Sequence, residues 1–322
     1  MKNPIPFTTL LLLIVTIFSC SQYVEKSEEK LPAISNTSLV ILGTVQDAGS
    51  PHIACVKACC KTLFANQNLS RKVVSIGLID PENKSNYIIE ATPDFTQQVK
   101  SLKQHSNFEH AETPDGIFLT HAHIGHYTGL MFLGKEAMNA KNIPLFAMPK
   151  MKSFLEQNGP WSQLVSNNNI WIQEINHQES VKLTSNLQVI PFLVPHRDEY
   201  SETVGYTING PNKSALFIPD IDKWGKWEVN IIDAIAKVDY AFVDATFYDG
   251  KEINNRDISQ IPHPFIIESM ELFKNLDASE KSKVYFIHFN HTNPVLNPSS
   301  QQTQQVLDYG FNMARIDDVF NL

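Results

Sequence analysis

The sequence predicts one layered α/β domain over residues 38–322, with β-sheets inside and helices outside. From residue 38 onward, short runs rich in β-branched and aromatic residues, bounded by turn residues, alternate with amphipathic segments. No internal repeat, low-complexity tract or second linker interrupts this stretch. A doubly wound parallel sheet is the alternative, but no glycine-rich phosphate loop follows the first expected strand.

The apolar runs are expected to be strands, and the amphipathic segments are expected to be helices. Strands are expected at 39–43, 73–79, 87–91, 116–120, 144–148, 187–194, 203–208, 215–218, 240–243 and 284–288. Helices are expected near 94–105, 126–134, 149–158, 226–237, 263–275 and 299–308. The first of these helices has Pro93 near its first turn, where proline is well tolerated.

Length and charge set limits on the function. A chain of 322 residues with 43% hydrophobic and 19% charged residues can bury a large core without disulfide support. The net charge of −8 provides no basic surface, so no nucleic-acid partner is expected.

The N-terminus predicts targeting rather than folded structure. Residues 1–20 form a lipoprotein signal peptide, with Lys2, an apolar run at 8–18 and the segment IFSC, which resembles a bacterial lipobox. Cys20 would then be the lipidated first residue of the mature chain; ordinary secretion, with Cys20 incidental, is the alternative. The polar, acidic residues 21–37 are expected to be a disordered tether. We therefore expect an extracytoplasmic protein held to a membrane of the bacterial cell envelope by its lipid, in the periplasm or at the outer membrane.

Three histidines lie close together in THAHIGHYTGL (120–130), directly after an expected strand. Residues i and i+2 of extended backbone point the same way, so His121 and His123 can hold one ion together. His126 falls where a helix begins, and it could approach the same cleft from another side to hold a second ion. Neutral imidazole is a common ligand of zinc, iron and related metals, so the triplet predicts a metal site.

Further residues of ligand type follow other expected strands. His196 follows the strand at 187–194, Asp220 lies just past 215–218, and His288 ends 284–288. Loops at the edges of sheets are where such scaffolds gather functional groups. Together with the triplet, these residues indicate one shared metal centre.

The ordered set His121, His123, His126, His196, Asp220 and His288 resembles the metal ligands of the metallo-β-lactamase superfamily, over about residues 38–314. The segments GTVQDAGSPHIACVKACC, ATPDFTQQ, THAHIGHYTGL and FIHFNHTNP resemble the branch containing pyrroloquinoline quinone biosynthesis protein B and the cyclic phosphodiesterase of phosphonate breakdown. The resemblance implies a four-layer αββα sandwich. It also implies that His121, His123 and His196 bind a first metal, that His126 and His288 bind a second, and that Asp220 bridges both as the catalytic carboxylate.

Gly125 departs from the resembled pattern, which has an aspartate there that binds the second metal and orients the bridging hydroxide. Losing that carboxylate should weaken the second site, so we expect one tightly bound zinc and a second that is weak or absent, with iron or manganese as alternatives. The candidate substitutes are Asp47, Asp94, Asp198 and Asp222, among which the sequence does not choose. A metal held by three imidazoles and Asp220 could still lower the pKa of a bound water toward about 7.

Past Cys20, the cysteines are Cys55, Cys59 and Cys60. A disulfide between two of them would close a very short loop and leave one thiol over. Three thiolates and one imidazole form a closed structural zinc site, which we expect here in preference to the disulfide. His291 is the candidate fourth ligand, since the resembled phosphodiesterase branch joins a cysteine cluster to a histidine just after the last catalytic one; His52 competes for this role.

Three other residues are candidates for supporting roles. Asp244 could orient a ligand imidazole, with a turn or helix-cap role as the alternative. Asn293 could donate a hydrogen bond to substrate, although Asn-Pro is also a common turn. His263, between two prolines, is expected at the rim or as a cap rather than as a ligand.

The expected function is hydrolysis of a small-molecule phosphodiester, ester or lactone by a metal-bound hydroxide. One alternative is non-haem iron chemistry with O₂, which the quinone-cofactor branch suggests. Another is a non-catalytic metal-binding lipoprotein, in which Gly125 marks decay of the site. The presence of His196, Asp220 and His288 argues against that decay.

Overall fold

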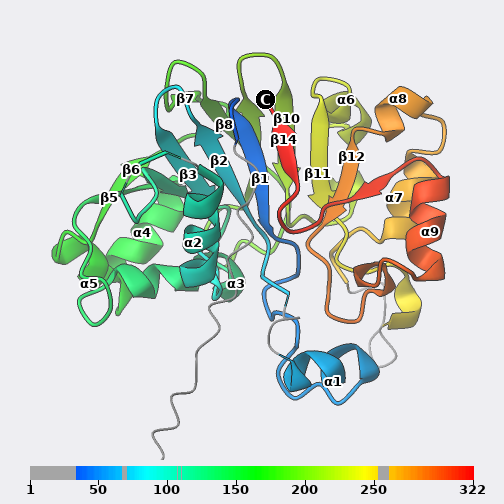
Figure 1. The fold of residues 1–322 in the computed structure, drawn as a ribbon, viewed down its shortest axis with the longest axis horizontal. Helices are drawn as coiled ribbons and strands as arrows, with labels where there is room; N and C mark the ends of the chain where they lie inside the picture. The colour runs from blue at the N-terminus through cyan, green and yellow to red at the C-terminus, as the bar shows by residue number, and fades with distance from the viewer. Residues whose placement is uncertain (1–33, 67–70, 107, 110, 253–260) are drawn as a thin grey trace, which may run out of the picture. The chain divides into compact units, whose positions relative to one another are not determined.

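The computed structural model describes residues 34–66, 71–106, 108–109, 111–252 and 261–322 (Figure 1). The predicted signal peptide with Cys20, and the tether before Ile34, lie outside the described residues. Ile34 is buried and the carbonyl of Thr37 accepts a hydrogen bond from Leu322, so packing begins slightly before the predicted boundary at residue 38. Among the described residues, no helix is both long and apolar enough to cross a bilayer.

Two seven-stranded sheets are present within the described residues, in the orders β14-β1-β2-β3-β4-β5-β6 and β13-β12-β11-β10-β9-β8-β7. The first contains β1 (Ser38–Gly43), β2 (Ser75–Asp80), β3 (Ser85–Ile89), β4 (Gly116–Phe118), β5 (Ile143–Ala147), β6 (Ile170–Glu174) and β14 (Val319–Asn321). The second contains β7 (Val181–Lys182), β8 (Gln188–Leu193), β9 (Val204–Asn209), β10 (Ser214–Ile218), β11 (Tyr240–Asp244), β12 (Val284–Ile287) and β13 (Asn312–Met313).

Helices cover the outer face of each sheet, as Figure 1 shows. The first sheet is covered by α2 (Phe95–Ser106), α3 (Ile124–Tyr127), α4 (Pro149–Gln157) and α5 (Trp161–Ser166), and the second by α6 (Ile231–Ile235), α7 (Ile266–Leu272), α8 (Ala278–Lys281) and α9 (Gln301–Asp308). The helix α1 (Ala58–Ala65) lies beyond the ends of the strands rather than over either face. The predicted αββα sandwich is therefore confirmed.

Alternation along the strands explains why both sheets are buried on both faces. On β1, Leu39 and Ile41 join the core between the sheets, whereas Val40 and Leu42 join the core under α2 to α5. The two faces of a strand alternate with period two, so a continuous apolar run such as LVIL serves both layers.

Each predicted strand is present, and the differences lie at the edges. The strands β7, β13 and β14 have only two or three residues each, too short for a periodic pattern, and β6 is partly exposed. The helix predicted at 126–134 is mostly a 3₁₀ helix, Thr128–Leu133, after the short α3.

The strand directions gather functional groups at one end of the sandwich. Strands β3, β4 and β5 run parallel, as do β10, β11 and β12. The carboxyl ends of parallel strands meet at the same edge of a sheet, so the residues that follow these strands come together there.

A buried carboxylate links the first sheet to the hairpin between β7 and β8. Asp80 is fully buried at the end of β2, and it accepts hydrogen bonds from Thr184 (2.6 Å), Asn186 (3.2 Å) and Asn83 (2.7 Å). Burial alone would raise the pKa of Asp80, but the hydrogen bonds from Thr184, Asn83 and Asn186 outweigh burial and lower it.

Replacing Asp80 with alanine should lower the free energy of unfolding by about 2–4 kcal/mol at pH 7, because several neutral donors lose a charged acceptor. Since the folded pKa is depressed, this contribution is complete above the unfolded value of about 3.9 and is lost as the pH falls further. Urea unfolding from pH 7 to pH 3 measures both effects. The exposed Asp308→Ala variant is the control, with an expected change within about 0.5 kcal/mol; an Asp80→Ala difference that stayed constant down to pH 3 would contradict this role.

Candidate metal centre

Strand ends deliver the predicted ligands to one place. His121 and His123 follow β4, His196 follows β8, and His288 follows β12 directly. His126 enters from α3. Because β10 and β12 lie on either side of β11, the segments after them carry Asp220 and His288 to the same edge.

Asp220 lies at the middle of this group. Its Oδ2 atom is 3.3 Å from Nε2 of His121, and its Oδ1 atom is 3.3 Å from Nε2 of His196. The Nε2 atoms of His126 and His288 lie 3.8 Å and 4.0 Å from Oδ2. One buried carboxylate is therefore within reach of both halves of the ligand set.

Three overlapping groups of donor atoms share Asp220: two contain the predicted ligands, and the third consists of Asp220, Asp244, His263 and His288. His121, His123, His196 and Asp220 form the first group, and Asp47, His126, Asp220 and His288 form the second; within each group one donor atom per residue lies within 4.8 Å of the others. In the first group, His123 presents Nδ1, which lies 2.8 Å from Nε2 of His121. Both groups have the imidazole and carboxylate donors that zinc accepts.

The outer nitrogen of each inward-facing imidazole has its own partner. Nδ1 of His121 contacts the hydroxyl of Thr120 at 2.9 Å, and Nδ1 of His288 contacts that of Thr246 at 2.8 Å. Nδ1 of His126 lies 3.2 Å from Glu90, and Nδ1 of His196 lies 3.4 Å from Asp222. Partners of this kind fix the orientation of metal-binding histidines.

Six buried polar atoms of the histidines and Asp220 at the centre lack a hydrogen bond of good geometry among the described residues. They are both ring nitrogens of His126 and His196, Nε2 of His288 and Oδ1 of Asp220. Buried polar atoms are normally satisfied, because leaving them unpaired costs free energy. A cation beside Nε2 of these three histidines and Oδ1 of Asp220 would satisfy the inward-facing atoms, so the residues suit a bound metal. The outer Nδ1 atoms of His126 and His196 face carboxylates instead.

The electrostatics favour an ionised carboxylate at the centre. Burial alone would raise the pKa of Asp220, but His196, His263 and His288 outweigh it and hold the pKa well below its usual range. Burial lowers the pKa of His121 well below its usual value, which leaves a neutral ring able to bind a metal.

Three side chains form the open side of the centre. Asp47, His123 and His263 are 22%, 15% and 12% exposed, whereas the side chains of Asp220, His126, His196 and His288 are 0–3% exposed. Glu199 contacts Nε2 of His123 at 3.3 Å and lines an adjoining open hollow of about 420 Å³. This is therefore the side on which the centre is exposed to solvent.

The structure distinguishes among the four carboxylates that could replace an aspartate at position 125. Asp47 lies within the second donor group. Asp94 accepts a hydrogen bond from the backbone of Val73, Asp198 accepts one from Thr203, and Asp222 contacts the outer nitrogen of His196.

Asp244, Asn293 and His263 have different roles from one another. Asp244 is fully buried; it accepts a hydrogen bond from Thr246 at 2.7 Å and lies 2.8 Å from Nδ1 of His263. The amide of Asn293 donates to the carbonyls of Ala245 and Thr246, so Asn293 stabilises the chain turn and is not free to donate to substrate. His263 lies closer to the centre than the rim position predicted for it, with Nδ1 3.1 Å from Oδ1 of Asp220.

Glu90 and Thr120 were not identified from the sequence. The hydroxyl of Thr120 donates to Glu90, which in turn faces His126. Glu90 has a φ of 83° and His288 a φ of 67°, a left-handed backbone that is uncommon outside glycine and often marks functional sites. The only sequence signal for Glu90 is a charged residue directly after an apolar strand.

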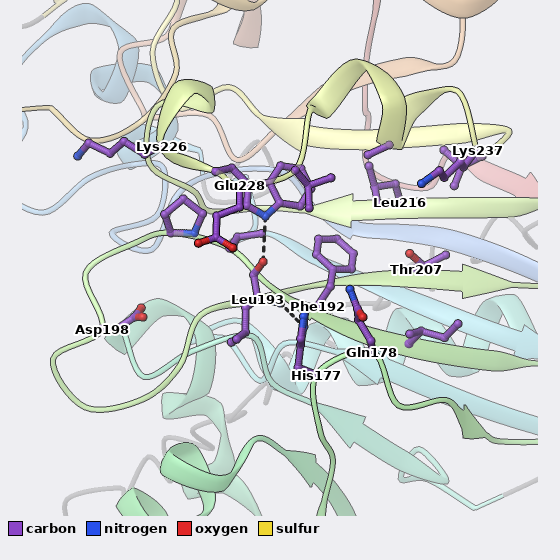
Figure 2. Close-up of a pocket in the computed structure, with 17 residues that line it drawn as sticks. His177, Gln178, Phe192, Leu193, Asp198, Thr207, Leu216, Lys226, Glu228 and Lys237 are labelled. Atoms are coloured by element: carbon purple, nitrogen blue, oxygen red, sulfur yellow. Dashed lines mark hydrogen bonds between the residues drawn. The ribbon is translucent and has the colours of Figure 1, made fainter.

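A separate cavity of about 670 Å³ lies against β8 and β10, near α6 (Figure 2). Phe192, Leu216 and Trp227 contribute to its mostly apolar lining. Leu193 donates to His177 from its backbone nitrogen and accepts from Trp227 at its carbonyl, both at 3.0 Å. None of the residues in the donor groups around Asp220 lines this cavity, so it is distinct from the metal centre.

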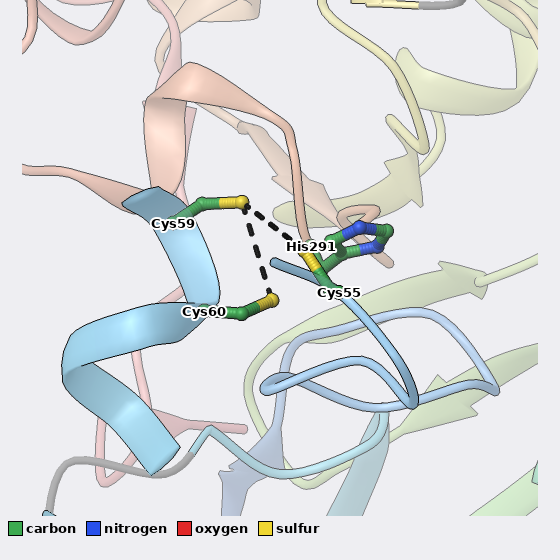
Figure 3. A group of neighbouring side chains, drawn as sticks. All are labelled: Cys55, Cys59, Cys60 and His291. Carbon is green, nitrogen blue, oxygen red and sulfur yellow. Dashed lines mark hydrogen bonds between the residues drawn. The ribbon is translucent and has the colours of Figure 1, made fainter. Parts of the chain in front are cut away.

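The three thiols gather around His291, as Figure 3 shows. Cys59 and Cys60 project from α1 toward Cys55 and His291, and the four ligand atoms lie within 4.8 Å of one another. The Cys55–Cys59 sulfur distance is 3.9 Å, and all three cysteines are free. His52 stacks on His291 at 4.3 Å and is not part of the group.

The ionisation of this cluster suits a bound cation. Burial lowers the pKa of His291 to about 4, so the ring is neutral. Burial also raises the pKa of Cys60 to about 12, so its thiolate would need a neighbouring positive charge. Three thiols and a neutral imidazole are the donors of a closed structural zinc site.

Comparison with known proteins identifies the class of protein to which this fold and site belong. The model of the beta-lactamase superfamily domain matches residues 85–289, so the chain belongs to the beta-lactamase superfamily. With its fold and its clustered imidazoles, the protein is a metallo-hydrolase of that superfamily and carries a metal cofactor.

More particular similarities define the branch. Coenzyme PQQ synthesis protein B from Methylorubrum extorquens (strain PA1) is 22% identical, over 86% of this chain and 97% of that protein. The crystal structure of Zn²⁺-bound PqqB from Methylobacterium extorquens aligns with a TM-score of 0.73 at 21% identity, over 88% of this chain and 100% of the other. A diphosphatase from the PhnP family aligns with a TM-score of 0.61 at 20% identity, over 88% and 96%. These similarities confirm the predicted branch.

If the thiol cluster binds zinc, replacing Cys55 with serine should remove about one zinc per chain and lower the melting temperature by roughly 5 °C or more. Elemental analysis and calorimetry on the same sample measure both. His52→Ala is the matched control, because His52 touches His291 without joining the donor group. Zinc content and melting temperature that are unchanged in the Cys55→Ser variant would exclude the structural zinc.

Proposed function

We propose that the protein is a zinc-dependent hydrolase that cleaves a small-molecule phosphodiester, ester or lactone outside the cytoplasm. His121, His123 and His196 would hold the first ion, His126 and His288 would hold the second, and Asp220 is within reach of both. The proposal rests on the arrangement around Asp220. The imidazoles face this one buried carboxylate, and their other ring nitrogens lie next to partner side chains outside the centre.

Zinc in such a site lowers the pKa of a bound water to about 7 and so provides hydroxide as the nucleophile at neutral pH. The protein side chains have three roles around that chemistry. Asp220, buried and ionised, balances positive charge between the two donor groups. Thr120, Thr246 and Glu90 keep the ligand rings in fixed orientations, which preserves the geometry during turnover.

Substrate enters from the side of Asp47, His123 and His263. The hollow of about 420 Å³ beside Glu199 is lined by polar residues and by Phe154 and Tyr200, and its size suits a small molecule. The buried sides of the centre exclude water and leave one direction of approach for the reacting bond.

The location is part of the same proposal. The signal-like residues 1–20, with the lipobox-like IFSC, support lipidation of Cys20 and anchoring of the domain to a membrane of the cell envelope. An extracytoplasmic position argues against a role in making a cytoplasmic cofactor.

Replacing His123 with alanine should lower kcat/KM against the best substrate of a panel, such as bis-p-nitrophenyl phosphate, aryl esters and lactones. Losing an outer partner of a ligand typically costs 10–100-fold, so losing the ligand itself should cost more than about 100-fold. The metal content of the same samples identifies the active ion after chelation and reloading with zinc, iron or manganese. His177→Ala, in the separate cavity, is the histidine control.

Hydrolysis that survives both chelation and the His123→Ala substitution would rule out the metal mechanism. Iron retained on purification, with O₂ uptake instead of hydrolysis, would favour the oxidative alternative.

Replacing Cys20 with serine should abolish incorporation of a labelled fatty acid and release the protein from the membrane fraction. Expression in a bacterial host with an alkyne fatty acid, followed by gel detection, measures the first effect, and fractionation measures the second. Cys55→Ser should keep its label and serves as the cysteine control. Labelling that persists in the Cys20→Ser variant would contradict the proposed anchor.

A further inference from the structure

We propose that Asp47 supplies the carboxylate ligand of the second metal, in place of the aspartate that the superfamily pattern has at position 125, and that Gly125 is needed to admit it. This inference rests on the proposed metal centre and specifies the ligands of its second site.

Asp47 is placed as a ligand of that site would be. Its Oδ1 atom lies 3.5 Å from Nε2 of His126 and 3.5 Å from Nε2 of His288. Both nitrogens are fully buried, and neither has a hydrogen bond of good geometry within the described chain. The same two nitrogens lie 3.8 Å and 4.0 Å from Oδ2 of Asp220. A cation between these four side chains would meet two imidazoles and two carboxylates, a donor set that zinc accepts.

Position 125 points directly at Asp47. A Cβ atom built on Gly125 would lie 2.1 Å from Cβ and 2.3 Å from Cα of Asp47, and 3.0 Å from its Cγ. Any side chain at 125 would therefore overlap Asp47 and its backbone. An aspartate at 125 would compete with Asp47 for the same space.

Glycine at this position is explained by space and not by backbone conformation. Gly125 lies inside α3, and its φ is outside the left-handed region. Glycine within a helix costs about 1 kcal/mol relative to alanine, so it needs a compensating reason. The close approach of Asp47 provides that reason.

Backbone pairing holds Asp47 beside His288. The segment after β1 runs next to the end of β12, where Phe289 donates to the carbonyl of Thr44 and Gln46 donates to that of Phe289, both at 2.9 Å. Val45 forms bridges to Val73 and to Phe289. The side-chain amide of Gln46 also donates to Oδ1 of Asp47 at 3.1 Å, which orients the carboxylate.

The experiment compares zinc binding by the full-length chain and three variants: Asp47→Asn, Gly125→Asp, and the double variant Asp47→Gly/Gly125→Asp. Each is dialysed against buffers of defined free zinc and analysed for zinc per chain. Asp47→Asn keeps the shape of the side chain but loses its charge, so its weaker active-site zinc should bind about 100-fold less tightly. Gly125→Asp alone should also lose that zinc, because the new side chain displaces Asp47.

The double variant should recover part of the lost affinity, because it returns the carboxylate to position 125 and removes the overlapping side chain of Asp47, which leaves only the backbone at residue 47 to shift. Asp198→Asn, which removes the charge of another aspartate near the site, should keep the zinc content of the wild type. Recovery in the double variant separates exchange of a ligand from general damage, and the Asp47→Asn result decides the question even if Gly125→Asp does not fold.

Zinc binding by Asp47→Asn that equals the wild type, or a wild-type chain with no second active-site zinc, would overturn the assignment. Hydrolysis is assayed separately on the same samples. A chain that binds zinc as described but hydrolyses nothing in the panel would refute the proposed function and leave the ligand assignment standing.

Discussion

The burial of Asp220 among six imidazoles is the constraint on which the site depends. A buried carboxylate and buried imidazoles are each unfavourable alone, so they persist only where the surrounding structure fixes them and a charge partner compensates. The fold meets this requirement by placing partner residues for the imidazoles at the ends of its strands. Parallel strands in both sheets bring Glu90 and Thr120 to one side of the centre, and Asp244 and Thr246 to the other. The ligand rings are therefore held in place from outside, independently of any bound ion.

The thiol cluster and the second donor group of the metal centre share two chain segments. The loop after β1 carries Asp47 and then Cys55 and α1, while the segment after β12 carries His288 and then His291. The proximity of Cys55 to His291 connects the end of this loop to the segment after β12. The start of the loop already pairs with the same segment through Gln46. A zinc ion at the thiols would thus restrain Asp47 as well as α1. This gives the cluster a purpose beyond stability, because the second donor group is complete only when that loop is in place.

The sequence predicted the parts of the site that depend on local pattern. His121 and His123 could be placed because a buried strand precedes them, and His196, Asp220 and His288 because each follows another apolar run. Residues whose role depends on contact through space could not be placed. Glu90 follows an ordinary strand, His263 sits between two prolines, and Asp47 was one of four equivalent aspartates until the strand order brought its loop beside His288. The short edge strands β7 and β13 were not predicted, because two residues are too few to show an alternating pattern.

Gly125 shows why a missing ligand in a sequence motif is weak evidence of lost function. Read along the chain, the absence of a carboxylate between His123 and His126 suggests a decayed site. In three dimensions, the space that such a side chain would need is filled by a carboxylate from a loop nearly eighty residues earlier in the chain. Decay would leave that space empty or filled by an apolar side chain, because there would be no reason to keep a second negative charge beside Asp220. Like charges this close are unfavourable unless positive charge lies between them. The presence of Asp47 at this point, with His126 and His288 facing it, is therefore evidence that the second donor group still serves a cation.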